Sequence, residues 1–120
     1  MSGQQTEIRG HRDGTVTAGG APLDHEPSLA VRSHSPSGFA WGYLGSGPSQ
    51  LALAILLWRG LGRQDALAFY QYFKEEVVAK WPGGQPFVYP VEQLDQWIEG
   101  RRGRQTDGCR ADRPPRSYSR

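Results

Sequence analysis

The chain has 120 residues, a formal net charge of +2 and a single cysteine, Cys109. This length suits one domain with a modest core, and one cysteine excludes an intrachain disulfide or a cysteine metal cage. The longest apolar run, residues 51–58, is far shorter than the roughly 20 residues that cross a bilayer, and the first residues do not read as a secretory signal. We therefore expect a cytoplasmic protein without a membrane segment.

The first part of the chain predicts a hairpin and a third strand. Residues 7–12 and 15–18 flank Asp13-Gly14, a pair that suits the positive φ angles of a two-residue turn. Residues 29–32 alternate between apolar and other side chains, which is typical of a half-buried strand. We expect three short antiparallel strands from these segments.

An aromatic segment follows and predicts a fourth strand. Phe39, Trp41 and Tyr43 alternate with small residues, so an extended backbone places the three rings on one face. Packing against the next helix is the interpretation that we favour for this face. A binding surface for a peptide or for bases is the alternative.

Two helices come next. Pro48 suits the first position of a helix, and the residues after it are apolar all round, which indicates a central helix closed by Gly60. Asp65 caps a second helix, which has apolar residues at three- and four-residue steps and ends near Trp81. Gln50 stands at the third helical position, where its side chain can reach back toward the cap.

The end of the chain predicts a strand over residues 87–89 and a last helix stopped by Gly100. The expected order is ββββααβα, an α+β fold with a small antiparallel sheet on a central helix. We expect a flexible segment over residues 1–5, one domain over residues 6–100 and a disordered tail over residues 101–120. That tail holds seven arginines against two aspartates and shows no apolar periodicity.

Three stretches carry a family resemblance: SHSPSGF (residues 33–39), WGY (41–43) and GSGPSQLALAILL (45–57). Together they resemble the signature of a small uncharacterised family of short bacterial proteins, many of them encoded on phages, plasmids and other mobile elements. The resemblance covers roughly residues 6–99 and implies one domain in a mobile-element setting. The family brings no established activity.

The junction between the glycine loop and the central helix is the best candidate for a ligand site. Consecutive backbone N–H groups at the start of a helix can bind an anion, and Pro48 removes one donor without abolishing such a site. A structural turn that seats the helix is the alternative. The candidate anion-binding residues are Gly45, Ser46, Gly47 and Ser49.

No recognisable catalytic set accompanies this loop. Ser46 lies between two glycines, but a nucleophile elbow needs glycine two residues away on each side, where Leu44 and Pro48 stand. Gln50 replaces the third glycine of a dinucleotide motif, and the lysine of a phosphate loop is absent. The three histidines are too isolated to indicate metal binding. We therefore expect no catalytic residue, no metal and no cofactor.

Two groups of residues are candidates for binding a macromolecule. The candidates for contact with a protein partner are Phe39, Trp41, Tyr43 and Gln50. Arginine clusters bind phosphates in a strongly salt-dependent way, so the Arg-rich segment is a candidate for nucleic acid. Its residues are Arg101, Arg102, Arg104, Arg110, Arg113 and Arg116.

These observations favour a non-catalytic protein-interaction module from a phage, plasmid or other mobile element. Such a protein acts as an adaptor or as an inhibitor of a host system, for example a defence system, and its partner is a host or phage protein. Two alternatives stay open: a nucleic-acid-associated protein that uses the Arg-rich segment, and an enzyme that binds an anion or nucleotide at the glycine loop.

Overall fold

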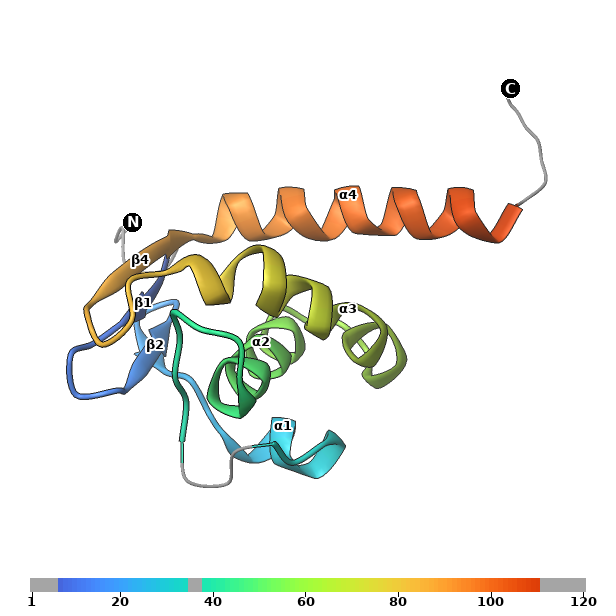
Figure 1. Cartoon of the computed structure of the whole chain (residues 1–120). Helices are drawn as coiled ribbons and strands as arrows, with labels where there is room; N and C mark the ends of the chain where they lie inside the picture. Colours follow the sequence, from blue (N-terminus) through green and yellow to red (C-terminus); the bar gives the residue numbers. More distant parts are fainter. Residues whose placement is uncertain (1–6, 35–37, 111–120) are drawn as a thin grey trace. The chain divides into compact units, whose positions relative to one another are not determined.

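The structure, a computed structural model, describes residues 7–34 and 38–110, and beyond residue 103 only the course of the last helix (Figure 1). The chain divides into two compact units, residues 1–89 and residues 90–120. The segment 1–5, which we expected to be flexible, lies outside the described residues. The expectation of one domain over residues 6–100 stays a prediction.

A hairpin opens the first unit, as the sequence predicts. β1 (Glu7–Gly10) pairs antiparallel with β2 (Val16–Ala18). The turn is wider than the expected two residues, because the N–H of His11 donates to the carbonyl of Thr15 at 2.8 Å. Gly14 supplies the positive φ, 93°, that this turn requires.

The sheet has four antiparallel strands in the order β3-β2-β1-β4. β3 (Ala21–Pro22) pairs antiparallel with β2, and β4 (Phe87–Pro90) lies beside β1, where the sequence predicts the strand over residues 87–89. Pro22 stands on the edge strand, the place in a sheet that tolerates a residue without an N–H donor. The α+β fold class is therefore confirmed.

The strand expected over residues 29–32 is wrong, because this segment belongs to a short helix. α1 (Glu26–Val31) begins where the Asp24 carboxylate accepts a hydrogen bond from the N–H of Glu26 at 3.1 Å, and a proline stands in its first turn. Ser28 is the residue that α1 buries. Four alternating residues are too few to outweigh these helix-start signals.

The strand expected over residues 39–43 is also wrong, because the segment pairs with no strand of the sheet. The N–H of Gly42 donates instead to the carbonyl of Val78 at 3.1 Å. Gly42 has a φ of 90°, which breaks the extended backbone in the middle of the aromatic run. The order of elements in the structure is therefore βββααα, a 3₁₀ turn, β and α.

The central helix is confirmed. α2 (Ser46–Trp58) is buried from its second residue to Leu56. It ends at a glycine, as predicted: Gly60 has a φ of 99°, and the next N–H, that of Leu61, donates back to the carbonyl of Leu56 at 3.1 Å. In Figure 1, α2 lies between α1 and α3, so it forms the core of the first unit.

The second predicted helix begins three residues earlier than expected. α3 (Arg63–Glu76) has Gly62 as its N-cap, and Asp65, the expected cap, lies in its first turn, where a carboxylate interacts favourably with the helix dipole. Its buried residues are Ala66, Phe69, Tyr70 and Phe73. A 3₁₀ turn, η2 (Val78–Lys80), follows, and the chain then turns toward β4.

The second unit contains α4 (Val91–Arg110), which runs ten residues beyond Gly100, the stop that we expected. Glycine lowers helix stability by about 1 kcal/mol without forbidding the helix, and arginine and glutamine after it are good helix formers. Residues 101–110 belong to this helix, residues 111–120 lie outside the described residues, and the disordered tail stays a prediction. Among the described helices, none is long and apolar enough to cross a membrane.

Candidate interaction surface

Trp41 links the connection between α1 and α2, residues 38–45, to a loop that is distant in the sequence. Its side chain is buried, and its indole N–H donates to the carbonyls of Pro82 at 3.0 Å and Gln85 at 2.9 Å. The indole ring also meets the ring of Phe87 edge to face, with centroids 4.9 Å apart. Trp41 is thus a packing residue, and it holds the connection, residues 38–45, in a fixed place.

The other aromatic residues of the connection reach the surface. Phe39 is half-buried and packs edge to face against His25, with ring centroids 4.7 Å apart and planes at 73°. Tyr43 is 52% exposed, and Leu44 beside it is 66% exposed. The three rings do not form the single face that the sequence predicts, because the backbone bends at Gly42.

Tyr43 also covers the start of α2. A Cβ on Gly45 would overlap the Tyr43 ring, and a Cβ on Gly47 would lie 2.6 Å from the Cβ of Ala40 and 3.3 Å from the Tyr43 hydroxyl. Both glycines are needed so that the ring and Ala40 can lie against the helix.

The four candidate anion-binding residues differ in their access to solvent. Ser46 is exposed and Gly45 is partly exposed, whereas Gly47 and Ser49 are buried. The structure therefore does not bring the four together at an open site. The anion site stays a prediction.

Gln50 lies away from this surface, in the core. Its Nε2 donates to the Ser28 hydroxyl at 2.9 Å and to the Arg32 carbonyl at 3.0 Å, and its Oε1 accepts from the N–H of His34 at 2.6 Å. A fully buried amide with these partners ties α1 and the residues after it to α2. Because this side chain is fully buried, it does not belong to the exposed surface of Tyr43 and Leu44.

His34 extends this polar network to α3. Its Nε2 lies 2.6 Å from the hydroxyl of Tyr70. Burial, and then the positive charges of Arg32 and Lys74, lower the pKa of His34 below its ordinary value. The neutral imidazole is therefore the form that this site favours.

A hollow of about 300 Å³ lies beside Tyr43, and we call it the apolar hollow. Arg12 is the charged residue that lines this hollow, and Gly83 and Gly84 form one part of its wall. The residues that define it are Arg12, Phe39, Trp41, Tyr43, Gly83 and Gly84.

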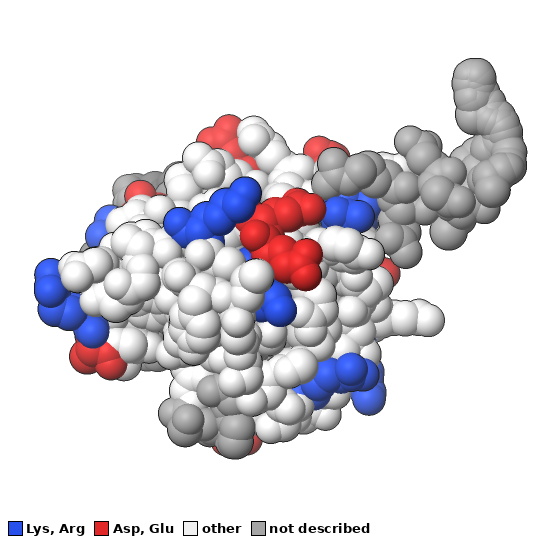
Figure 2. Space-filling view, viewed as in Figure 1, with Lys and Arg blue, Asp and Glu red and all other residues white. Residues whose placement is uncertain are grey.

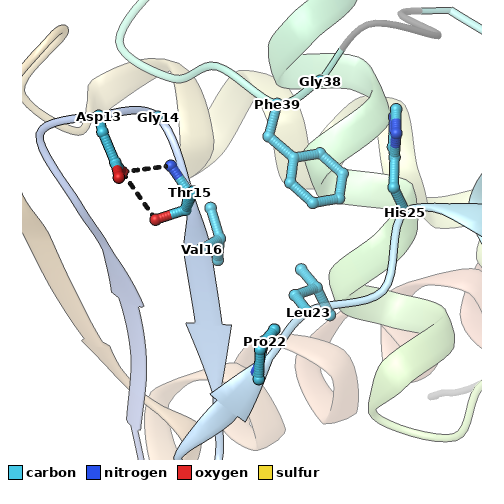
Figure 3. Close-up of a pocket in the computed structure, with 9 residues that line it drawn as sticks. All are labelled: Asp13, Gly14, Thr15, Val16, Pro22, Leu23, His25, Gly38 and Phe39. Carbon is cyan, nitrogen blue, oxygen red and sulfur yellow. Dashed lines mark hydrogen bonds between the residues drawn. The ribbon is translucent and has the colours of Figure 1, made fainter.

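A second hollow, of about 390 Å³, is also lined by Phe39, and we call it the polar hollow (Figure 3). Gly14 and Phe39 line both hollows, so the two are neighbours. The residues that define the polar hollow are Asp13, Thr15, Val16, Leu23, His25 and Phe39.

The surface around the connection carries few charges. Figure 2 shows an uncharged area over the part of this face where residues 38–45 run, with Lys, Arg, Asp and Glu side chains around it. The connection itself contains two exposed large apolar side chains, Tyr43 and Leu44. An uncharged area with exposed aromatic and aliphatic side chains has the composition of the centre of a protein interface.

The arginines that we assigned to nucleic acid fall in three groups. Arg101 and Arg102 lie in α4, where the first is half-buried and the second exposed. The structure gives Arg104 and Arg110 a place in the same helix, and the remaining two, Arg113 and Arg116, lie outside the described residues. Binding of nucleic acid by this segment stays a prediction. In the described ranges, no three His, Cys, Asp or Glu side chains gather closely enough to hold a metal ion.

Sequence reasoning missed the residues that complete the two hollows. Arg12 was recognised only as part of a strand and Gly14 only as part of a turn, and Gly83 and Gly84 were not singled out, although this glycine pair lies beside Trp41 in the structure. A turn signal is local, so it does not indicate which distant segment the turn will meet. The glycine pair itself was the available signal, because glycine often marks a close approach of two backbone segments.

Comparison with known proteins agrees with the resemblance. A family model described as a family of unknown function, DUF6166, matches residues 5–100. The chain belongs to this family. No curated protein and no solved structure matches the chain. The family membership supports an uncharacterised domain and assigns no activity.

Proposed function

We propose that this chain is a non-catalytic module that binds another protein through the surface formed by Tyr43, Leu44 and the apolar hollow. The observation that carries the proposal is the exposure of these two side chains, 52% and 66%, on a connection that is itself held firmly. Side chains of this kind stabilise an interface when they lose little conformational freedom on binding.

The connection is preorganised by contacts on both sides of Tyr43. Trp41 donates two hydrogen bonds to residues 82 and 85, and Gly42 donates one to Val78. Tyr43 itself lies over Gly45 and Gly47 at the start of α2. A partner therefore meets a surface that is already in place.

A protein partner fits this surface better than a nucleic acid does. Bases stack on exposed aromatic rings, but such sites also carry basic residues that follow the phosphates. Arg12 alone supplies a positive charge to the wall of the apolar hollow. An apolar side chain of another protein is the occupant that matches the remaining wall.

The finer parts of the proposal come from the resemblance. A mobile-element origin makes a host protein the partner that we expect, and it makes a component of a host defence system one example. The family membership supports an uncharacterised domain, and the partner's identity is part of the proposal.

The test compares retention of host proteins by purified chains that differ at the proposed surface. Leu44→Asp places a charge in the apolar area without touching the packing of Tyr43 on α2, and Tyr43→Ser removes the ring. We expect one protein to be retained in stoichiometric amount by the unaltered chain and to be lost with both variants. Melting curves followed by circular dichroism show that each variant is folded.

Tyr72→Ser is the matched control, because Tyr72 is 44% exposed on α3, outside the proposed surface. We expect this variant to retain the partner. Equal retention by Leu44→Asp and by the unaltered chain, or no stoichiometric partner at all, would contradict the proposal.

A further inference from the structure

The polar hollow beside Phe39 has an acidic end. Asp13 stands at its rim, and Figure 3 shows Phe39 between Thr15 and His25 across the opening. The Oδ1 atom of Asp13 accepts hydrogen bonds from the Thr15 N–H at 3.0 Å and from the Thr15 hydroxyl at 2.7 Å. These two bonds fix the direction of the carboxylate, and the same oxygen atom accepts both of them.

The same bonds keep this carboxylate charged. The side-chain bond from Thr15 and then its backbone bond lower the pKa of Asp13 below the ordinary value. At neutral pH the rim of the hollow therefore carries a fixed negative charge.

The part of the sequence that contributes most of the lining residues also contains more acidic than basic residues. Between Arg12 and Arg32 the sequence contains no lysine or arginine and three acidic residues, Asp13, Asp24 and Glu26, all of them exposed. A cation is attracted to such a region, and an anion is repelled from it.

The floor of the hollow is apolar. Val16 and Leu23 are buried beneath it, and the ring of Phe39 forms a wall. A volume of about 390 Å³ holds one long side chain. The combination of an apolar floor and a carboxylate at the rim suits a methylene stem that ends in a cationic group.

We propose that the polar hollow binds a lysine or arginine side chain of the partner protein. The proposal rests on the proposed function, because this basic residue neighbours the apolar side chain that enters the apolar hollow. Arg12 lines the apolar hollow and Asp13 lines the polar hollow, so the two charges set the direction in which the partner segment lies across Phe39. Phe39 presents a ring to the cation, which adds a cation–π contact.

The probe for this site is a single capped amino acid. Nα-acetyl-arginine methylamide is titrated into the ¹⁵N-labelled full chain, and Nα-acetyl-citrulline methylamide serves as the neutral counterpart of nearly equal shape. We expect the arginine probe to shift the amide signals of Thr15, Val16 and Leu23, and the citrulline probe to leave them unchanged.

Matched variants then test the carboxylate. Asparagine can still accept the bonds from Thr15, so Asp13→Asn removes the charge while it keeps the turn. We expect this variant to weaken binding of the arginine probe about tenfold. Glu26→Gln removes an exposed charge that does not line the hollow, and we expect it to change the affinity less than about twofold.

Two results would overturn the inference: equal shifts with the citrulline probe, or unchanged affinity in Asp13→Asn. The outcome is separable from that of the proposed function, which is tested by partner retention in Leu44→Asp. If partner retention depends on Leu44 but Asp13→Asn leaves the affinity for the arginine probe unchanged, the proposed protein interface is supported. The proposed basic residue of the partner is then wrong. If the arginine probe binds through Asp13 but no partner depends on Leu44, the polar hollow stands and the proposed function fails.

Discussion

Gly47 shows how a single missing side chain seats the central helix. Glycine lowers the stability of a helix interior, but at this position a methyl group would meet the Cβ of Ala40 at 2.6 Å. Ala40 belongs to the connection that Trp41 holds in place, so neither side can easily move. The glycine loop is therefore explained by close packing at the start of α2.

We predict that Gly47→Ala lowers the free energy of unfolding by about 1 to 2 kcal/mol, because overpacking outweighs the gain in helix propensity. Urea unfolding measures the change. Gly100→Ala is the matched control, since a Cβ at Gly100 in α4 meets no atom within 4 Å. That variant should raise the free energy of unfolding by up to about 1 kcal/mol. A rise in both variants would show that the start of α2 is not closely packed.

His34 makes the stability depend on pH. Its folded-state pKa lies below the ordinary value of 6.5, so the unfolded chain binds a proton more readily than the folded one. The stabilisation from the neutral imidazole is therefore complete above pH 6.5 and is lost as the pH falls through the range below it. Asp13 also has a lowered pKa, but it affects the stability only when the pH falls to near 3.8, the ordinary value for this carboxyl.

We predict that the free energy of unfolding falls as the pH is lowered below about 6.5, and that His34→Gln flattens this slope. Urea unfolding at several pH values measures it. His11→Gln is the control, because the His11 ring lies near Thr17 in the hairpin, outside the network of Tyr70. If His11→Gln flattens the slope as much as His34→Gln does, the assignment to His34 is wrong.

At the scale of elements, α1 depends on its neighbours. A helix of six residues is not stable alone in water, and the buried amide of Gln50 supplies three of the contacts that hold α1 and the chain after it. Gln50 thus joins two elements that are separate in the sequence.

We predict that Gln50→Leu lowers the free energy of unfolding by about 2 to 4 kcal/mol, because it leaves polar groups on Ser28, Arg32 and His34 without this partner. Hydrogen exchange of the α1 amides should also become faster than exchange in α2. Gln64→Leu, at an exposed position of α3, should change the stability by less than about 0.5 kcal/mol. Slow exchange of α1 in Gln50→Leu would mean that other contacts hold this helix.

Patterns within a few neighbouring residues predicted some helices and strands correctly and others wrongly. The hairpin and α2 follow from an Asp-Gly turn and from a long apolar run, both of which act over neighbouring residues. The segments 29–32 and 39–43 alternate in the same way as strands, but residues 29–31 belong to α1 and the backbone N–H of Gly42 finds its partner at Val78 in η2. Short alternation does not decide between these outcomes, because tertiary contacts determine where each N–H is satisfied.

At the scale of the whole molecule, the candidate surface could be predicted only in part. Tyr43 was named from the sequence, whereas Gly83 and Gly84 come to it from forty residues further along the chain. Gln50 was assigned to the same surface because it follows the glycine loop, but the helical backbone carries its side chain to α1. Proximity in sequence misplaced this residue, since a helix presents successive side chains in different directions.

The order of the strands has a consequence for folding during synthesis. β1 is made at the start of the chain, but its neighbour β4 ends at Pro90. Until then, the backbone N–H and C=O groups along one edge of β1 have no strand to pair with, and such an edge can pair with another chain. Closing so long a stretch of chain also slows folding. The nascent protein therefore passes through a period in which its first strand is vulnerable to aggregation, and completion of residues 87–90 ends that period.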